Sequence, residues 1–104
     1  MIRLKNTYIA LARKNLDGLI VSQASNITYL TKFPSRDSYL LVSRKENLYF
    51  TDSRYIEEAK RALKGTVGLE KANGSVFKLI ADACLNLGLR RIGFEERYLA
   101  YAEH

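Results

Sequence analysis

The sequence predicts a single α/β domain in three layers, with a mixed sheet of about five strands between two layers of helices. The chain has 104 residues, 47% of them hydrophobic, which is enough for one core and too little for two. Stretches with helical spacing of apolar residues alternate with short apolar runs, the pattern of an α/β fold. Two of the runs are separated by only a few polar residues, which favours a β-hairpin within the sheet.

Four segments have the spacing of amphipathic helices. They cover residues 2–15, about 25–33, about 53–64 and 75–87. Ser25 or Asn26 is the expected N-cap of the second helix, and Asp52 or Ser53 that of the third, because their side chains can accept a backbone hydrogen bond. Gly65 is the expected C-terminal cap of the third helix.

Five short runs are predicted strands. They cover residues 18–22, 38–44, 47–51, 66–70 and 90–94, the fourth being the weakest. The second and third form the hairpin and should pair antiparallel, whereas strands separated by a helix should pair in parallel. A further helix is expected to begin in the last ten residues, 95–104.

Composition excludes several classes of protein. One cysteine cannot form an intramolecular disulfide, and no apolar run approaches the ~18–20 residues of a membrane span. The N-terminus has no uninterrupted apolar core, so no secretory signal is expected and a cytoplasmic location is the default. The net charge is +6, but the basic residues are scattered in runs no longer than two, so nucleic-acid binding is not the expected function.

Few side chains suit metal binding or catalysis. The only histidine is His104, which is either native or the remnant of a purification tag, and the only cysteine, Cys84, lies on the apolar stripe of the fourth helix. We therefore expect no metal site and no catalytic residue in this chain, and an inert Cys84 thiol. Glycine-rich phosphate-binding loops are missing as well.

The most specific stretch runs from Asp17 to Tyr55. Its pieces, in order, are DGLIV (17–21), NITYLT (26–31) followed by Phe33, YLLV (39–42) and TDSRY (51–55). This series resembles the N-terminal domain of the creatinase, prolidase and aminopeptidase P family, the pita-bread metallopeptidases. RIGFE (91–95) followed by Tyr98 fits the same family. The resemblance implies that residues 1–104 form one creatinase N-terminal-domain-like unit with a ribonuclease H-like architecture.

The resemblance also implies a function. In this family a separate C-terminal domain holds two divalent metal ions (Mn, Co or Zn) and cleaves bonds preceding proline. This chain resembles only the non-catalytic N-terminal domain of an Xaa-Pro dipeptidase or aminopeptidase, so it should have no peptidase activity alone. The implied partners are its own C-terminal catalytic domain and a second subunit in a homodimer. The alternative is a stand-alone α/β module that binds protein or nucleic acid.

By resemblance, the domain lends a loop to the active-site entrance of the neighbouring subunit. The residues expected there are Phe33, Ser35, Arg36 and Asp37. A plain solvated connection is the other interpretation of this polar loop. The loop departs from the family pattern, which usually has glycine at Lys32 and a glycine- and serine-rich stretch after Phe33.

Other motif residues are expected to support the domain. They are Asn26, Tyr29, Asp52, Arg54 and Tyr55. Arg54 is expected to pair with Asp52 or Asp37 and thereby to order the loop.

Overall fold

The computed structural model describes residues 2–94, with side chains from residue 7 onward. The predicted helix in the last ten residues, Tyr98 and His104 lie outside the described residues. The elements follow the predicted order and are α1 (Ile2–Arg13), β1 (Gly18–Val21), α2 (Ala24–Thr31), β2 (Tyr39–Ser43), β3 (Leu48–Thr51), α3 (Ile56–Leu63), β4 (Gly68–Lys71), α4 (Val76–Asn86) and β5 (Ile92–Phe94).

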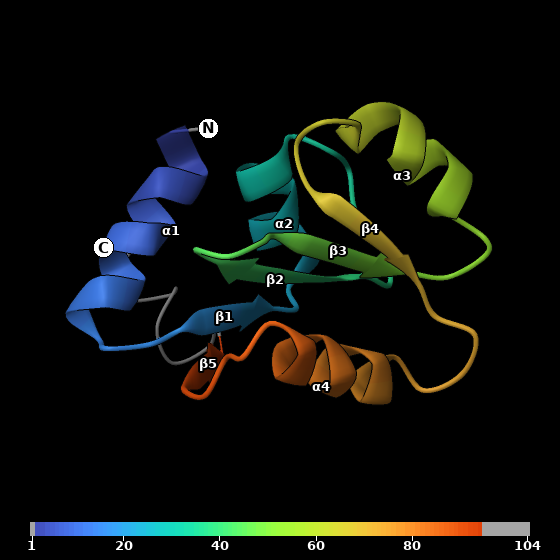
Figure 1. Cartoon of the computed structure of the whole chain (residues 1–104). Helices are drawn as coiled ribbons and strands as arrows, with labels where there is room; N and C mark the ends of the chain where they lie inside the picture. Colours follow the sequence, from blue (N-terminus) through green and yellow to red (C-terminus); the bar gives the residue numbers. More distant parts are fainter. Residues whose placement is uncertain (1, 95–104) are drawn as a thin grey trace.

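The strands form one mixed sheet in the order β4-β3-β2-β1-β5 (Figure 1). The hairpin of β2 and β3 is antiparallel and β3 pairs with β4 in parallel, as predicted. The prediction is wrong for β1 and β2, which are separated by α2 and yet pair antiparallel. The physical reason is the path of the link. After α2 the chain turns back, and Val21 at the end of β1 faces Leu40 near the start of β2.

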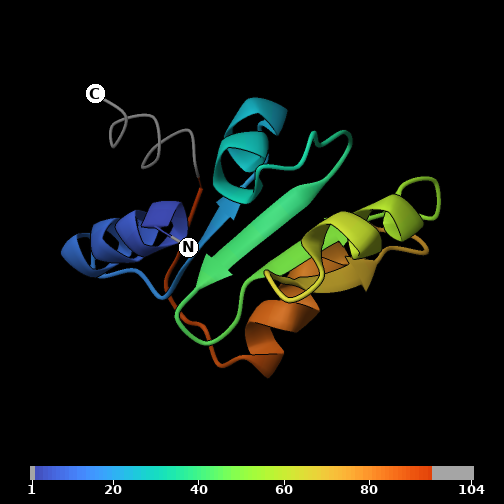
Figure 2. The ribbon, with the colours of Figure 1, turned by 90° about the horizontal axis from the view of Figure 1, so that it is seen from above.

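The helices lie in two unequal layers. Figures 1 and 2 show α1, α2 and α3 over one face of the sheet and α4 on the other. The larger core cluster, on the three-helix side, includes the fully buried Val21, Ile27 and Leu30. The smaller cluster, under α4, joins Leu41 and Phe50 to the apolar stripe of that helix. The predicted three-layer α/β class is confirmed.

Two of the predicted caps are displaced. The N-cap of α2 is Gln23, because the Gln23 carbonyl already accepts the N–H groups of Asn26 and Ile27. The N-cap of α3 is Tyr55, because the Tyr55 carbonyl accepts a hydrogen bond from the Ala59 N–H, while the Asp52 carboxylate accepts one from the Arg54 N–H instead of capping the helix. Neither Gln23 nor Tyr55 caps its helix through its side chain.

Two other predicted helix ends agree with the structure. The Ser75 hydroxyl accepts a hydrogen bond from the Lys78 N–H at the start of α4. Gly65 follows the end of α3 with φ of +80°, the left-handed conformation that glycine adopts at least cost.

A reciprocal contact joins the starts of β1 and β5. The Asp17 carboxylate accepts hydrogen bonds from the N–H groups of Arg90 and Arg91, at 2.8 and 3.0 Å. In return, the Asp17 N–H donates to the Arg91 carbonyl at 2.7 Å. These two N–H groups lower the pKa of Asp17 below its usual value because they stabilise the charged carboxylate. The carboxylate thus fixes β5 beside β1.

Candidate functional site

The candidate site is the loop of residues 32–38, which joins α2 to β2. Lys32 and Asp37, near its two ends, both have positive φ angles, of 62° and 45°. Side chains with a Cβ adopt this conformation at some cost. The family's usual glycine at Lys32 is therefore explained by the left-handed end of α2, where the Lys32 N–H donates to the Thr28 carbonyl.

The underside of the loop is attached to the core. The Tyr49 hydroxyl, from β3, donates to the Ser35 hydroxyl at 3.1 Å, and Ser35 donates in turn to the Phe33 carbonyl at 3.0 Å. The Phe33 ring packs edge-on against the Tyr49 ring, with centroids 6.0 Å apart. The side chains of Phe33 and Ser35 are both buried. They hold the loop in place from beneath.

Two threonines of α2 hold the loop from the side. The Phe33 N–H donates to the Thr31 hydroxyl at 3.2 Å, and the Ser35 N–H donates to the Thr28 hydroxyl at 3.3 Å. Thr31 itself donates to the Ile27 carbonyl within the helix. The loop backbone is therefore fixed by side chains that the sequence places in the NITYLT segment.

The outer face of the loop is charged. Arg36 and Asp37 are exposed, and a nitrogen of the Arg54 guanidinium lies 3.4 Å from the Asp37 carboxylate. The same guanidinium makes a closer pair with Asp52, at 2.6 Å, and packs over the Tyr55 ring at 4.9 Å. Arg54 thus pairs with both of the carboxylates expected for it.

The Asp52–Arg54 pair is also joined through the backbone. The Arg54 N–H donates to the Asp52 carboxylate at 2.9 Å, so both the guanidinium and the backbone of Arg54 bind this carboxylate. The hydrogen bonds from the guanidinium lower the pKa of Asp52 and raise that of Arg54, because each charge stabilises the other. Both groups remain charged at neutral pH. Arg54 therefore presents a fixed cation next to Asp37.

The residues predicted from the sequence lie in three places, namely the outer surface of the loop and turn, the underside of the loop, and α2. Arg36, Asp37, Asp52, Arg54 and Tyr55 belong to the charged outer surface of the loop and the turn before α3. Phe33 and Ser35, expected at the entrance, form its buried underside instead of its exposed surface.

Asn26 and Tyr29 lie on α2. Asn26 is half-buried and its amide donates to the Gln23 side chain at 3.4 Å, whereas Tyr29 is exposed. Sequence reasoning missed Tyr49. Its position between Leu48 and Phe50 in a buried strand was the available signal, because a buried tyrosine needs a partner for its hydroxyl.

Residues 2–94 offer neither a metal site nor a membrane span. No group of three His, Cys, Asp or Glu side chains in this part of the chain could hold a metal ion. The half-buried Cys84 has a raised pKa because burial disfavours the thiolate. None of the described helices is both long and apolar enough to cross a bilayer.

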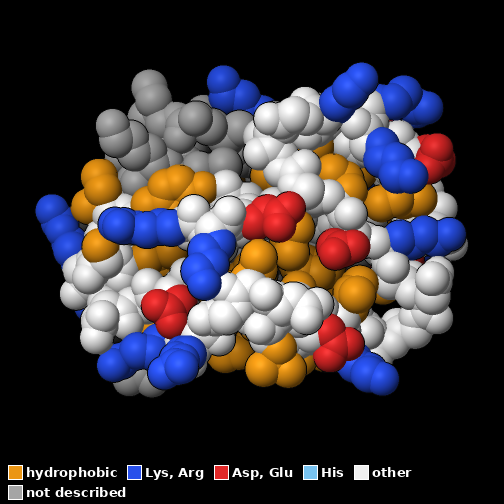
Figure 3. All heavy atoms as spheres, in the orientation of Figure 1, with side chains coloured by type: hydrophobic (Ala, Val, Ile, Leu, Met, Phe, Trp, Pro, Cys, Tyr) orange, Lys and Arg blue, Asp and Glu red, His pale blue; other side chains and the backbone are white. Residues whose placement is uncertain are grey.

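The surface charges do not gather at one place on the face shown in Figure 3. Lys and Arg side chains are spread across it, with Asp and Glu between them. A nucleic-acid interface usually concentrates positive charge in one patch or stripe. This face gives no support to the nucleic-acid alternative.

Comparison with known proteins places the chain in a family. The sequence model described as the Creatinase/Prolidase N-terminal domain matches residues 3–104. An uncharacterized peptidase of Bacillus subtilis, YqhT, is 30% identical over 89 residues, which are 86% of this chain and 25% of that protein. The chain therefore spans about a quarter of the length of this relative.

Solved structures show the same fold. An Xaa-Pro dipeptidase from Bacillus anthracis superposes over the whole chain with a TM-score of 0.85 and 24% identity, and the match covers 30% of that protein. The N-terminal domain of the cytoplasmic peptidase PepQ from Mycobacterium tuberculosis gives a TM-score of 0.81 with 23% identity. That match covers 92% of this chain and 74% of the PepQ domain.

Proposed function

The chain belongs to the Creatinase/Prolidase N-terminal domain family, and we propose that it is the non-catalytic first domain of a longer Xaa-Pro dipeptidase or aminopeptidase. The observation that carries the proposal is the match over residues 3–104, nearly the whole chain, together with peptidase relatives of which it spans about a quarter. The remaining three quarters of such a relative leave room for a catalytic domain. These matches favour the peptidase reading over a stand-alone binding module.

The metal chemistry of the proposed peptidase belongs to that second domain. Residues 2–94 contain no group of ligands that fits a divalent ion. Two ions, Mn, Co or Zn, would be held by side chains of the C-terminal domain, and no catalytic step is assigned to this chain. A cytoplasmic location is part of the proposal, in line with the description of PepQ as a cytoplasmic peptidase.

For the loop we propose a role at the active-site entrance of the neighbouring subunit in a homodimer. The support is its construction: a backbone fixed by Tyr49, Thr28 and Thr31, with the charges of Arg36 and Asp37 on the outside. A short peptide carries an ammonium group at one end and a carboxylate at the other. Asp37 suits the first group and Arg36 the second.

The first experiment is to express the full reading frame of the gene and the 104-residue chain side by side. Turnover of an Xaa-Pro dipeptide and of a longer Xaa-Pro peptide is measured with added Mn²⁺, Co²⁺ or Zn²⁺, and mass is measured by light scattering. We expect metal-dependent turnover and a dimer for the full product, and no turnover for the 104-residue chain. A reading frame that stops at residue 104, or turnover by the short chain above contaminant level, contradicts the proposal.

Charge-removing variants of the full product test the loop. Arg36→Gln and Asp37→Asn should each lower kcat/KM by about fivefold or more, mainly through KM, because a contact to a peptide terminus is lost. Lys78→Gln and Asp82→Asn are matched controls on α4, in the opposite layer, and should leave kcat/KM unchanged. Equal effects in all four variants would refute the entrance role.

A further inference from the structure

One of the six asparagines of the chain is followed by glycine. Asn73 and Gly74 form this pair, in the turn that joins β4 to α4, whereas each of the other five precedes a residue with a larger side chain. The pair is chemically special because the backbone nitrogen of the next residue can attack the side-chain amide of asparagine. A Cβ on that next residue hinders the attack, and glycine has none and also adopts the widest range of backbone angles.

The fold leaves this pair free to react. Asn73 and Gly74 are both exposed and belong to neither β4 nor α4. A Cβ built on Gly74 would meet nothing within 4 Å, so no neighbouring group crowds its nitrogen. Within the described part of the chain, no hydrogen bond engages the Asn73 amide or the Gly74 N–H. Both reacting groups therefore face water.

A second pair of the same kind is held closed by the fold. Aspartate can close the same ring as asparagine, and Asp17 is followed by Gly18. However, the Asp17 carboxylate accepts the N–H groups of Arg90 and Arg91, and the Gly18 N–H donates to the Arg91 carbonyl at 3.3 Å. Gly18 is also buried, with three apolar side chains at 3.2–3.3 Å from the position of a Cβ. The structure thus separates one reactive pair from one protected pair.

We propose that Asn73 is a site of spontaneous deamidation in the folded protein, with water as the co-reactant and aspartate or isoaspartate as the product. The Gly74 nitrogen loses its proton to the solvent and bonds to the side-chain carbonyl carbon of Asn73. The bond from that carbon to the amide nitrogen breaks, and the nitrogen leaves as ammonia after taking a proton from the solvent. One water then opens the five-membered ring. Opening at the side-chain carbonyl gives aspartate, and opening at the main-chain carbonyl gives isoaspartate.

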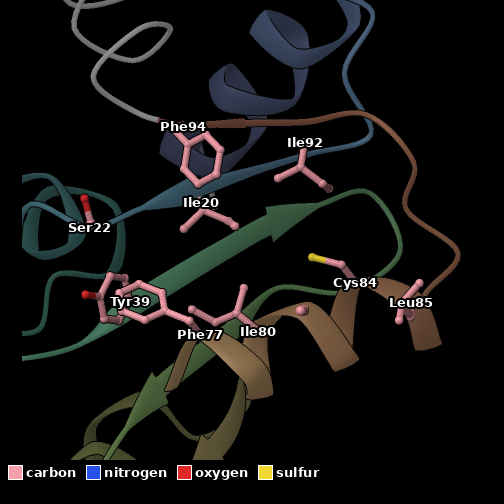
Figure 4. A pocket seen from close by; sticks show the side chains of 10 residues that line it. Ile20, Ser22, Tyr39, Phe77, Ile80, Cys84, Leu85, Ile92 and Phe94 are labelled. Carbon is pink, nitrogen blue, oxygen red and sulfur yellow. The ribbon is translucent and has the colours of Figure 1, made fainter. Parts of the chain in front are cut away.

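The two products should affect α4 differently. Both place a carboxylate at position 73 and lower the net charge of +6 by one. Isoaspartate also adds a carbon to the main chain, two residues before Ser75, the N-cap of α4. Phe77 and Ile80 extend from this helix toward the groove of about 760 Å³ beside β1 and β5 (Figure 4), and the Phe77 ring lies edge-on to Tyr39 with centroids 5.4 Å apart. A longer link should displace this first turn, whereas aspartate should leave it in place.

The test follows the folded 104-residue chain over time in mildly alkaline buffer. Peptide mass mapping detects the exchange of an amide for a carboxylate, and electron-transfer fragmentation distinguishes isoaspartate from aspartate. Asn15 and Asn86 are internal controls, since both are exposed but precede leucine. Asn73 should react at least about tenfold faster than either control, because only Gly74 lacks a Cβ. Equal rates at the three asparagines would overturn the proposal.

Two comparisons separate the roles of the sequence and the fold. Gly74→Ala keeps Asn73 and introduces a Cβ without a clash, so it should slow the reaction at least about tenfold. An unchanged rate in this variant would overturn the proposal. Asp17 should form isoaspartate in the urea-unfolded chain and not in the folded chain. Equal rates at Asp17 in both states would show that the fold does not select between the two pairs.

Melting temperatures test the effect on α4. Asn73→Asp carries the new charge without the added carbon, and should keep Tm within about 2 °C of the wild type. The isoaspartate form, separated from the aged protein by ion exchange, should melt at least about 4 °C lower. Equal Tm values for the two forms would refute the displacement of α4. The reaction needs only this chain and water, so its outcome is independent of the proposed peptidase function.

Discussion

The hydroxyl of Tyr49 on β3 donates a hydrogen bond to the hydroxyl of Ser35, 3.1 Å away in the loop of residues 32–38. The Ser35 hydroxyl in turn donates a hydrogen bond to the Phe33 carbonyl. The buried Tyr49 side chain thereby helps to fix the backbone of the loop, and this gives the exposed charges of Arg36 and Asp37 a defined position.

Tyr49→Phe should destabilise the domain. The variant removes only the hydroxyl that bonds to Ser35, and the loss of one buried hydrogen bond costs about 1 kcal/mol. In a domain of this size that lowers Tm by about 4–8 °C, measurable by circular dichroism. Tyr39→Phe is the matched control, since the edge-on contact of its ring with Phe77 is retained. Equal losses in the two variants would argue against the Ser35 contact as the cause.

Arg54→Ala should loosen the loop without unfolding the domain. The Arg54 side chain is 59% exposed, and exposed ion pairs contribute little to stability, so Tm should change by no more than about 2 °C. Amide hydrogen exchange in residues 32–38 should become faster, and kcat/KM of the full-length product should fall.

Two further substitutions define the role of Arg54. Arg54→Lys should give a partial effect, because lysine keeps the charge but cannot hold Asp52 with a planar fork. Arg61→Ala, at an exposed position of α3, is the control. If Tm, exchange and kcat/KM are all unchanged in Arg54→Ala, Arg54 does not order the loop.

Asp17 should make stability depend on pH in the acid range. Its folded pKa is lowered from the ordinary value of 3.8, first by the N–H groups of Arg90 and Arg91. The stabilisation is therefore complete above 3.8 and is lost as the pH falls through the folded pKa.

The measurement for Asp17 is Tm as a function of pH for the wild type and for Asp17→Asn. The difference between the two proteins should be constant above about pH 5 and should shrink below the ordinary carboxyl pKa. A difference that stays constant down to pH 2 would show that the charge of Asp17 contributes nothing.

Gly68→Ala should destabilise the junction of β3 and β4. A Cβ there would lie 2.8 Å from a methyl group of the buried Leu48 and 2.9 Å from the Glu46 carboxylate. Such overpacking costs about 1–3 kcal/mol. Gly74→Ala is the control, since its Cβ meets nothing within 4 Å, and it should be neutral or slightly stabilising. Urea unfolding of both variants gives the comparison.

The order and type of the elements could be predicted because apolar spacing is a local property. The apolar side of each helix also follows from the periodicity of its own residues, whereas the division into three helices on one face and α4 on the other does not. The antiparallel pairing of β1 with β2 could not be predicted in this way, since a link of this length permits either direction. After α2 the chain turns back toward β2, and there the Thr31 and Thr28 hydroxyls accept the N–H groups of Phe33 and Ser35.

The site was predictable in part. The pairing of Arg54 with Asp52 and Asp37 follows from charges placed close together by the TDSRY turn and the loop. The burial of Phe33 and Ser35 does not follow, because it depends on Tyr49, which reaches the loop from another strand. The positive φ of Lys32 does not follow from the residue type either, since lysine itself has no preference for it; it belongs to the left-handed end of α2.

The Asp17 contact with Arg90 and Arg91 has a consequence for synthesis on the ribosome. β1 obtains its first neighbour once residue 43 has emerged, but its second neighbour, β5, begins only at residue 92. At roughly 5–20 residues per second, one side of β1 stays unpaired for several seconds. During that interval the nascent chain exposes an unpaired strand edge that can pair with other chains. The interval ends when β5 pairs with β1 and the Arg90 and Arg91 N–H groups bind the Asp17 carboxylate.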